Sequence, residues 1–455
     1  MTTPAEEPTM PVAMPNPRRL GRFLEAQRRD GPLLLWALAV GGLAGLVGGA
    51  FHATLEALGD LRARFDAGAF GGAEPSVWLA AAVSAALAAS AVWLVRRFAP
   101  EAGGSGIQEV EGALDGLRPV RWRRLLPVKF VAGALAIGSG LALGREGPTV
   151  QMGAALGRML SDRFGLGEER AHVLLAAGAG AGLTAAFNAP LAGMLFVIEE
   201  MRPHFHYNAI SVQAILLACA ASDIVVRLLM GGSAVLPMAP IPAPPLAMLW
   251  IFPLLGVLLG SVGFAFNQAL VAMVDRSATW NETRRLLFAA SIGAAVGVLG
   301  LEFGEFIGGG ERLIEHALAG GLTTISLLLL FLGRFGLTIL SYGTGAPGGI
   351  FAPMLALGTL FGLWFGQTAH GLFPDLSVPG QVFTVAAMGA LFSATVRAPI
   401  TGIVLAMELT GSYAQLLPIV LTCVPATLVA HGLGGMPIYT VLLERLLERE
   451  APPAT

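Results

Sequence analysis

A single acidic residue stands inside an apolar stretch, in the segment GSGLALGREGPTVQ at residues 138–151. Glu146 follows Arg145, and both lie between Gly144 and the pair Gly147–Pro148. An ionisable residue within a membrane segment is costly and marks a functional candidate. A carboxylate carries protons, and in its ionised form it also resembles a bound anion. The alternative is structural: Arg145 and Glu146 would pair and cap a helix end near the membrane surface.

Three glycine-rich breaks, each followed by an apolar helical segment, would supply an anion site. They are GGSGIQE (103–109), GREGPTV (144–150) and GTGAPGGIFAP (343–353). A helix that begins inside the membrane leaves its first N–H groups unpaired, and its N-terminus carries about half a positive charge. Several converging N-termini would bind an anion without a basic side chain at the centre, which also permits release. There, ionised Glu146 would close the path, and protonated Glu146 would leave it.

Other polar residues have both a functional and a structural interpretation. Ser105 in the first break would donate its hydroxyl to an anion or act as a helix N-cap. Tyr439 in GGMPIYT would do the same or lie at the membrane interface like many aromatic residues. Glu199 and Glu200 end an apolar segment, where solvated charges are ordinary.

The composition indicates an all-α polytopic membrane protein. The 455-residue chain is 55% hydrophobic and 13% charged, against about 25% charged residues in soluble domains. Continuous apolar runs, each long enough for a membrane helix, exclude the alternating pattern of a barrel. They include 33–50, 77–95, 124–143, 210–230, 285–301 and 322–340. The net charge of −2 gives no reason to expect nucleic acid, and we expect no metal, no cofactor and no enzyme activity.

Arginine positions predict the orientation in the membrane. Basic residues gather before the first span, between 18 and 29, and again in the loop 96–124, so both regions are expected to be cytoplasmic. Counting spans from there places Glu146 towards the outer side or mid-membrane. The same count places Glu200 at the cytoplasmic side. Cys219 and Cys423 lie in apolar runs and are expected to be small buried residues.

The two halves of the chain resemble each other. Residues 180–200 align without gaps on 389–409, which pairs Pro190 with Pro399 and Glu199 with Glu408. Upstream, 147–157 aligns on 352–362, and the GxxxG spacing in both segments predicts helix packing. Repeats with broken segments are typical of transporters whose site lies between the halves. The alignment itself does not tell whether the repeats are inverted.

We therefore divide the chain into a cytoplasmic basic tail at 1–31, a transmembrane domain at 32–447 and a short tail at 448–455. The halves of the domain are placed at 32–230 and 243–447. No C-terminal regulatory domain is expected.

Four motifs in order resemble the CLC family of chloride channels and transporters. They are GSGI around Ser105, GREGPTVQ (144–151), GAPGGIFAP (345–353) and PIY (437–439), within a match from about residue 33 to 447. EAGGSGIQEVEGAL, RPVRW, LPVKF, NAPLAG and IEEMRP are similar to the bacterial proton-coupled chloride antiporters. The resemblance implies a CLC-type fold of two inverted-repeat halves with broken and tilted helices, and a homodimer with one anion pathway per subunit.

The resemblance also implies roles for single residues. Ser105 and Tyr439 would donate hydroxyls to a central anion, and the backbone N–H groups of Ile350 and Phe351 would complete its site. Glu146 would be the gating glutamate.

On the cytoplasmic side, Glu200 would transfer protons, with Lys129 as its companion. Glycines and a basic residue of the breaks would support the site; these are Gly106, Gly144, Arg145 and Gly147. One departure is Gln108, which stands where the family usually has proline.

The implied activity is secondary active exchange of chloride for protons across a bacterial inner membrane, with chloride, protons and lipid as partners. The alternative is a passive voltage- or pH-gated chloride channel, against which Glu200 argues. A fluoride exporter is disfavoured by Ser105 and Tyr439. A rhomboid-like protease would pair Ser105 with His431, far apart in the chain.

Overall fold

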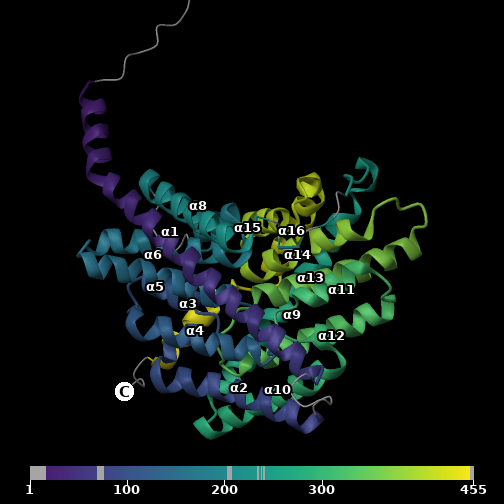
Figure 1. Cartoon of the computed structure of the whole chain (residues 1–455). Helices are drawn as coiled ribbons and strands as arrows, with labels where there is room; N and C mark the ends of the chain where they lie inside the picture. Colours follow the sequence, from purple (N-terminus) through teal and green to yellow (C-terminus); the bar gives the residue numbers. More distant parts are fainter. Residues whose placement is uncertain are drawn as a thin grey trace, which may run out of the picture.

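The computed structural model describes residues 17–68, 76–201, 208–232, 235–236, 238 and 241–450, with side chains from residue 31 onward. Within these residues every regular element is a helix, and two segments meet in one isolated β-bridge. Figure 1 shows α2 and α10 packed together at one end of the body and α8, α15 and α16 at the other.

The helices of the first half are α1 (Pro17–Asp66), α2 (Val77–Phe98), α3 (Ile107–Leu114), α4 (Trp122–Gly138), α5 (Glu146–Phe164), α6 (Glu168–Phe187), α7 (Pro190–Glu200) and α8 (Ala209–Met230). Those of the second half are α9 (Ile251–Ala278), α10 (Glu282–Glu302), α11 (Glu311–Ala319), α12 (Thr324–Gly343), α13 (Phe351–Leu372), α14 (Gly380–Val396), α15 (Pro399–Thr410), α16 (Leu416–Gly432) and α17 (Ile438–Glu450). Short 3-10 turns lie at η1 (Pro100–Ala102), η3 (Leu246–Met248), η4 (Gly304–Phe306) and η5 (Tyr413–Gln415).

Seven segments of the described chain are long and apolar enough to cross a membrane, which confirms a multi-pass membrane protein. They fall on α1, α2, α8, α9, α10, α12 and α16. The predicted span at 124–143 is wrong in length, because α4 ends at Gly138 after 17 residues. Gly140 has a φ of +97°, a left-handed conformation that suits glycine and turns the chain out of the helix.

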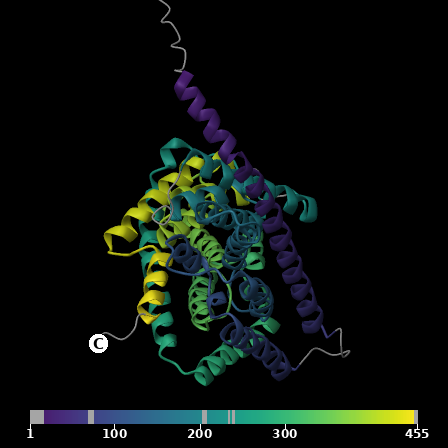
Figure 2. The same ribbon diagram turned by 90° about the vertical axis from the view of Figure 1, so that its left-hand side faces the viewer.

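Helix α1 begins inside the predicted tail. It runs without interruption from Pro17 through Pro32 to Asp66. Figures 1 and 2 show its first turns projecting beyond the body while the rest follows one side of it. Residue 31 is therefore not a break in the backbone between tail and membrane domain.

The two halves are inverted with respect to each other, as the equivalent helices α7 and α15 demonstrate. Near the end of α7, the Glu199 carboxylate accepts hydrogen bonds from the N–H groups of Ile400 and Thr401 at the start of α15, at 3.0 and 2.7 Å. Near the end of α15, the Glu408 carboxylate accepts from the N–H groups of Leu191 and Ala192 at the start of α7, at 3.2 and 2.8 Å. Each helix thus ends beside the start of the other, so the two run antiparallel.

Small residues let neighbouring helices approach within each half. A Cβ added to Gly153 on α5 would lie 2.1 Å from the carbonyl oxygen of Gly178 on α6. A Cβ added to Gly362 on α13 would lie 2.6 Å from the carbonyl oxygen of Phe383 on α14. The GxxxG spacing therefore packs helices within one chain, as the sequence predicts.

The two cysteines occupy related positions in this packing. A Cβ at Gly180 would lie 3.0 Å from Cys219 Sγ, and one at the equivalent Gly389 would lie 3.1 Å from Cys423 Sγ. Both thiols are buried and free. They serve as small packing residues of the two halves.

We predict that the carboxylates of Glu199 and Glu408 stabilise the fold to a similar extent. Glu408→Gln removes the charge that the N-terminus of α7 attracts, and it should lower the free energy of unfolding by about 1–2 kcal/mol. Glu199→Gln should do the same at α15, and both would reduce the apparent Tm in detergent.

Glu302→Gln, at an exposed helix end, is the control and should leave Tm unchanged. An unchanged Tm in both test variants would show that the reciprocal caps do not stabilise the fold.

Candidate anion and proton site

Ser105 lies in the break before α3 and is fully buried. The N-cap of α3 is Gly106, with a φ of +89°, so Ser105 is not the helix cap. Within the described chain its Oγ has no hydrogen-bond partner. A buried hydroxyl without a partner is costly, which marks it as a donor available to a ligand.

Lys129 on α4 holds this break in place. Its Nζ donates to the carbonyl oxygens of Ala102, Gly104 and Ser105, at 3.0, 2.9 and 3.0 Å. These three bonds use all the donors of an ammonium group. Lys129 thus supports the site by fixing the backbone of Ser105, and its companionship with Glu200 stays a prediction.

Tyr439 lies in the first turn of α17 and is also fully buried, so it is not an aromatic of the membrane interface. Its ring centroid is 6.0 Å from that of Phe351 on α13. Its hydroxyl, like that of Ser105, has no partner among the residues described. The structure thus brings a second unsatisfied hydroxyl to the start of α13.

Glu146 caps the N-terminus of α13. Its side chain is fully buried, and its Oε2 accepts from the N–H of Ala352 at 3.4 Å. Ile350 is the N-cap of that helix and Phe351 its first residue. A carboxylate therefore occupies the place where a helix N-terminus would bind a free anion.

Arg145 does not form the pair with Glu146 that a structural role would require. Its Nε donates to the carbonyl oxygen of Ala186 at 3.1 Å, and its Nη1 lies 3.0 Å from Nε2 of His52. Its Nη2 forms an ion pair with Glu311 at 3.3 Å. The guanidinium thus ties the start of α5 to three other elements.

Two glycines make the close approach of these groups sterically feasible. A Cβ on Gly144 would lie 2.1 Å from Glu146 Oε2, and one on Gly147 would lie 2.4 Å from Ser105 Oγ. Gly144 also pairs with Gly349 through two backbone hydrogen bonds of 2.8 and 2.7 Å. This bridge locks the break of the first half onto that of the second.

Glu200 is the last residue of α7 and only 7% exposed, so it is not a solvated helix-end charge. Its Oε1 finds no hydrogen-bond partner in the part of the chain that the structure describes. The side chains of Arg202 to Tyr207, which follow it, lie outside the described residues.

Sequence reasoning missed Glu111. This residue of α3 is fully buried, and neither carboxyl oxygen has a partner within the described ranges. It interacts electrostatically with Glu200. Its neighbour Glu109 pairs with Arg118 at 2.9 Å. The signal in the sequence is EVEG at 109–112, two acids in the short helix behind the first break.

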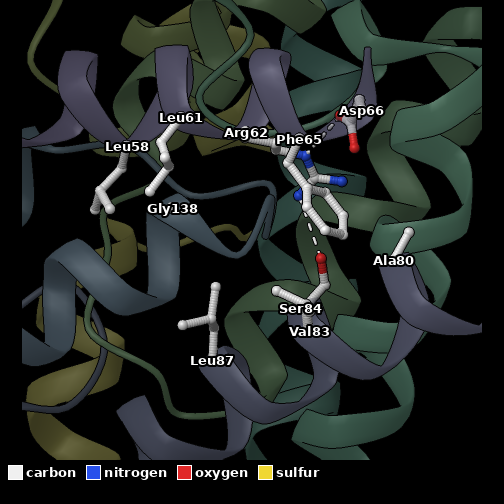
Figure 3. A pocket seen from close by; sticks show the side chains of 10 residues that line it. All are labelled: Leu58, Leu61, Arg62, Phe65, Asp66, Ala80, Val83, Ser84, Leu87 and Gly138. Atoms are coloured by element: carbon white, nitrogen blue, oxygen red, sulfur yellow. Dashed lines mark hydrogen bonds and ion pairs between the residues drawn. The ribbon is translucent and has the colours of Figure 1, made fainter. Parts of the chain in front are cut away.

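A cavity of about 590 Å³ opens beside Glu146, on the side predicted to face the outer solution, since Gly144, Arg145 and Ala352 line it. Arg62 forms part of its wall and donates to the carbonyl oxygen of Ser139 at 2.8 Å. Figure 3 shows Arg62 beside Asp66 and Ser84, with apolar side chains around a second cavity of about 240 Å³. Arg62 thus separates the polar cavity from an apolar one.

The protease interpretation lacks its dyad. His431 is exposed at the end of α16, whereas Ser105 is buried. Because Ser105 Oγ has no partner in the described structure, the two side chains are not hydrogen-bonded as nucleophile and base.

Comparison with known proteins gives matches over nearly the whole chain. The voltage-gated chloride channel family matches residues 86–431. An H(+)/Cl(-) exchange transporter, ClcA, of Vibrio cholerae serotype O1 is 50% identical over 436 residues, covering 95% of this chain and 93% of that protein. The transporter of the same name in Salmonella arizonae is 45% identical over 460 residues, covering 98% and 96%.

Solved structures share the fold. The crystal structure of a slow cyanobacterial Cl-/H+ antiporter has a TM-score of 0.88 and 38% identity, covering 92% of this chain and 98% of that one. A CLC-type fluoride/proton antiporter has a TM-score of 0.71 and 22% identity, covering 88% and 96%, and shows the fold alone.

We predict that the hydroxyls of Ser105 and Tyr439 both contribute to the affinity for chloride. Ser105→Ala and Tyr439→Phe each remove one donor, and each should weaken chloride binding by about 1.5–3 kcal/mol, as expected for a hydrogen bond to a charged group. Isothermal titration calorimetry of the purified protein measures this loss.

Tyr413→Phe is the matched control, because that tyrosine is 65% exposed on η5. It should bind chloride like the parent. Unchanged affinity in both test variants would remove Ser105 and Tyr439 from the anion site.

Proposed function

The chain belongs to the voltage-gated chloride channel family, and from this membership we propose that it is a chloride/proton antiporter, which exchanges the two ions across a membrane by secondary active transport. The observation that carries the proposal is the buried Glu146 carboxylate on the N-terminus of α13. The relatives named as H(+)/Cl(-) exchange transporters support the choice of ions.

The proposed anion path passes the hydroxyls of Ser105 and Tyr439. Both are buried and unsatisfied among the described side chains, and no lysine or arginine is needed at the centre. Neutral donors and helix N-termini bind an anion strongly enough to dehydrate it and weakly enough to release it. The backbone N–H groups of Ile350 and Phe351 are proposed to complete the site, since both residues stand at the start of α13.

Proton and chloride movements are coupled because the Glu146 carboxylate and a chloride ion compete for the N-terminus of α13. While Glu146 is ionised, it holds the N-terminus of α13 and excludes a chloride ion there. When Glu146 is protonated, it loses its charge-assisted bond to that N-terminus, and chloride can replace it. Each exchange of carboxylate for chloride thus requires a proton to bind or leave.

Protons need a second titratable group to reach the cytoplasmic side. Glu200 is proposed for this role because it is buried at the end of α7 and one of its carboxyl oxygens lacks a partner in the described structure. Its electrostatic neighbour Glu111 extends the acidic region into α3. A passive channel has no need for a buried carboxylate here.

We further propose a homodimer in a bacterial inner membrane. The family resemblance and the bacterial relatives support both statements. Large apolar side chains are exposed on α7, α8, α15 and α16, where lipid or a second subunit would cover them; they include Leu191, Leu216, Ile224, Leu228, Ile400, Leu417, Val424 and Leu428.

Glu200→Gln tests the antiport proposal in liposomes that hold the purified protein, followed with chloride and pH electrodes. The parent should move protons uphill when a chloride gradient drives it. The variant keeps the shape of the side chain without its titration, so proton movement should fall to the level of protein-free liposomes while chloride still flows.

Glu199→Gln is the matched neighbour and should keep proton movement, because Glu199 caps α15. Chloride flux without proton movement in the parent would instead identify a passive channel. Uphill proton movement that survives in Glu200→Gln would remove Glu200 from the proton path.

A further inference from the structure

His52 on α1 stands between an acid and a base at the outer mouth of the site. Its Nε2 lies 3.0 Å from Nη1 of Arg145 and 3.2 Å from Oε1 of Glu56. The imidazole lines the outer cavity of about 590 Å³ and an adjoining one of about 280 Å³. Both cavities are also lined by Glu311 and Glu315 of α11, so this cluster forms the wall between them.

The two contacts of Nε2 exclude each other chemically. A guanidinium only donates hydrogen bonds, and an ionised carboxylate only accepts them. Without a proton, Nε2 accepts from Arg145 and faces the lone pairs of Glu56. In the imidazolium, where both ring nitrogens carry protons, Nε2 donates to Glu56 and the ring presents a like charge to Arg145. Histidine is the side chain that ordinarily changes charge between about pH 5 and 8.

The contact with Arg145 bears on Glu146 because Arg145 is the N-cap residue of α5 and Glu146 the first residue of that helix. Arg145 has two other ties, to the carbonyl oxygen of Ala186 and to Glu311. The tie to His52 is the one that links it to α1. Without this hydrogen bond, the Arg145 guanidinium interacts only with the carbonyl oxygen of Ala186 and the acidic residues of α11, and the start of α5 is held less firmly.

We propose that His52 is a positioning residue for proton exchange on the outer side: it ties Arg145, and with it the first turn of α5, to α1 only while its Nε2 carries no proton. Acid in the outer solution turns the imidazolium to Glu56 and releases Arg145 towards Glu311 and Glu315. Glu146 then leaves the N-terminus of α13 more readily. The proposal rests on the antiport function proposed above and adds a second titrating group to it.

Two substitutions of His52 should change the turnover in opposite directions. In His52→Gln, the amide accepts from Arg145 and donates to Glu56 at every pH, so the tie stays closed. In His52→Ala, the acceptor is absent, and the tie stays open. Turnover at acid outer pH should fall roughly two- to tenfold in His52→Gln, and turnover at neutral outer pH should rise by a similar factor in His52→Ala.

The experiment measures chloride-driven proton movement by reconstituted protein while the outer pH varies from about 5 to about 8 at constant inner pH. Both variants should lose the step in turnover that the parent shows in this range. His316→Gln, an exposed histidine on α11, is the control and should keep the profile of the parent. Size-exclusion chromatography in detergent should give the same elution for all four proteins, which verifies that each is folded.

A double variant tests whether His52 acts by positioning Glu146 or affects the ion path directly. In Glu146→Ala there is no carboxylate to position, so adding His52→Ala should leave chloride flux unchanged at every outer pH. A flux that still depends on His52 in this background would overturn the proposal, as would parental pH profiles in both single variants. Failure of the antiport function is distinguishable, because the parent itself would then move no protons.

Discussion

The structure depends on one constraint: a helix that begins inside a membrane must have its first N–H groups satisfied by something other than water. Carboxylates meet this need at three places in the described chain. Glu199 and Glu408 cap α15 and α7 permanently, each from the opposite half. Glu146 caps α13 by the same interaction, but it lies beside a polar cavity and two unsatisfied hydroxyls. The same chemistry is thus structural where nothing competes and functional where a free anion reaches the helix.

The surroundings of Glu146 explain why a carboxylate and a chloride ion are interchangeable there. Gly144 and Gly147 leave no room for a side chain between the carboxylate, the Ser105 hydroxyl and the backbone bridge. Lys129 lies behind Ser105 with all three donors bound to carbonyl oxygens, so its charge supports the loop without occupying the anion path. The proposed exchange follows from this arrangement, since each occupant must leave before the other enters.

Much of this site could be predicted from the sequence, because its residues stand where apolar segments are interrupted by glycine runs or charges. Ordinary membrane helices have neither. Glu146 and Ser105 were singled out in this way, whereas the role of Tyr439 came from the resemblance to the family. The repeat was visible in the positions of Pro190 and Pro399. Contacts between distant segments could not be predicted. The carbonyl partners of Lys129, the burial of Glu111 and the reciprocal caps of α7 and α15 depend on how the halves pack. The end of α4 at Gly138 was missed because the apolar sequence continues through the turn. The helix nevertheless ends there, since the backbone of Gly140 is left-handed.

Anomalous diffraction from crystals grown in bromide tests the central claim, that Glu146 occupies an anion position. Bromide replaces chloride and can be located by its anomalous signal. In Glu146→Ala the account predicts a bromide ion within hydrogen-bond distance of the Ala352 N–H, at a place where the parent has none. An empty N-terminus of α13 in the variant, with bromide bound elsewhere in the same crystals, would contradict it.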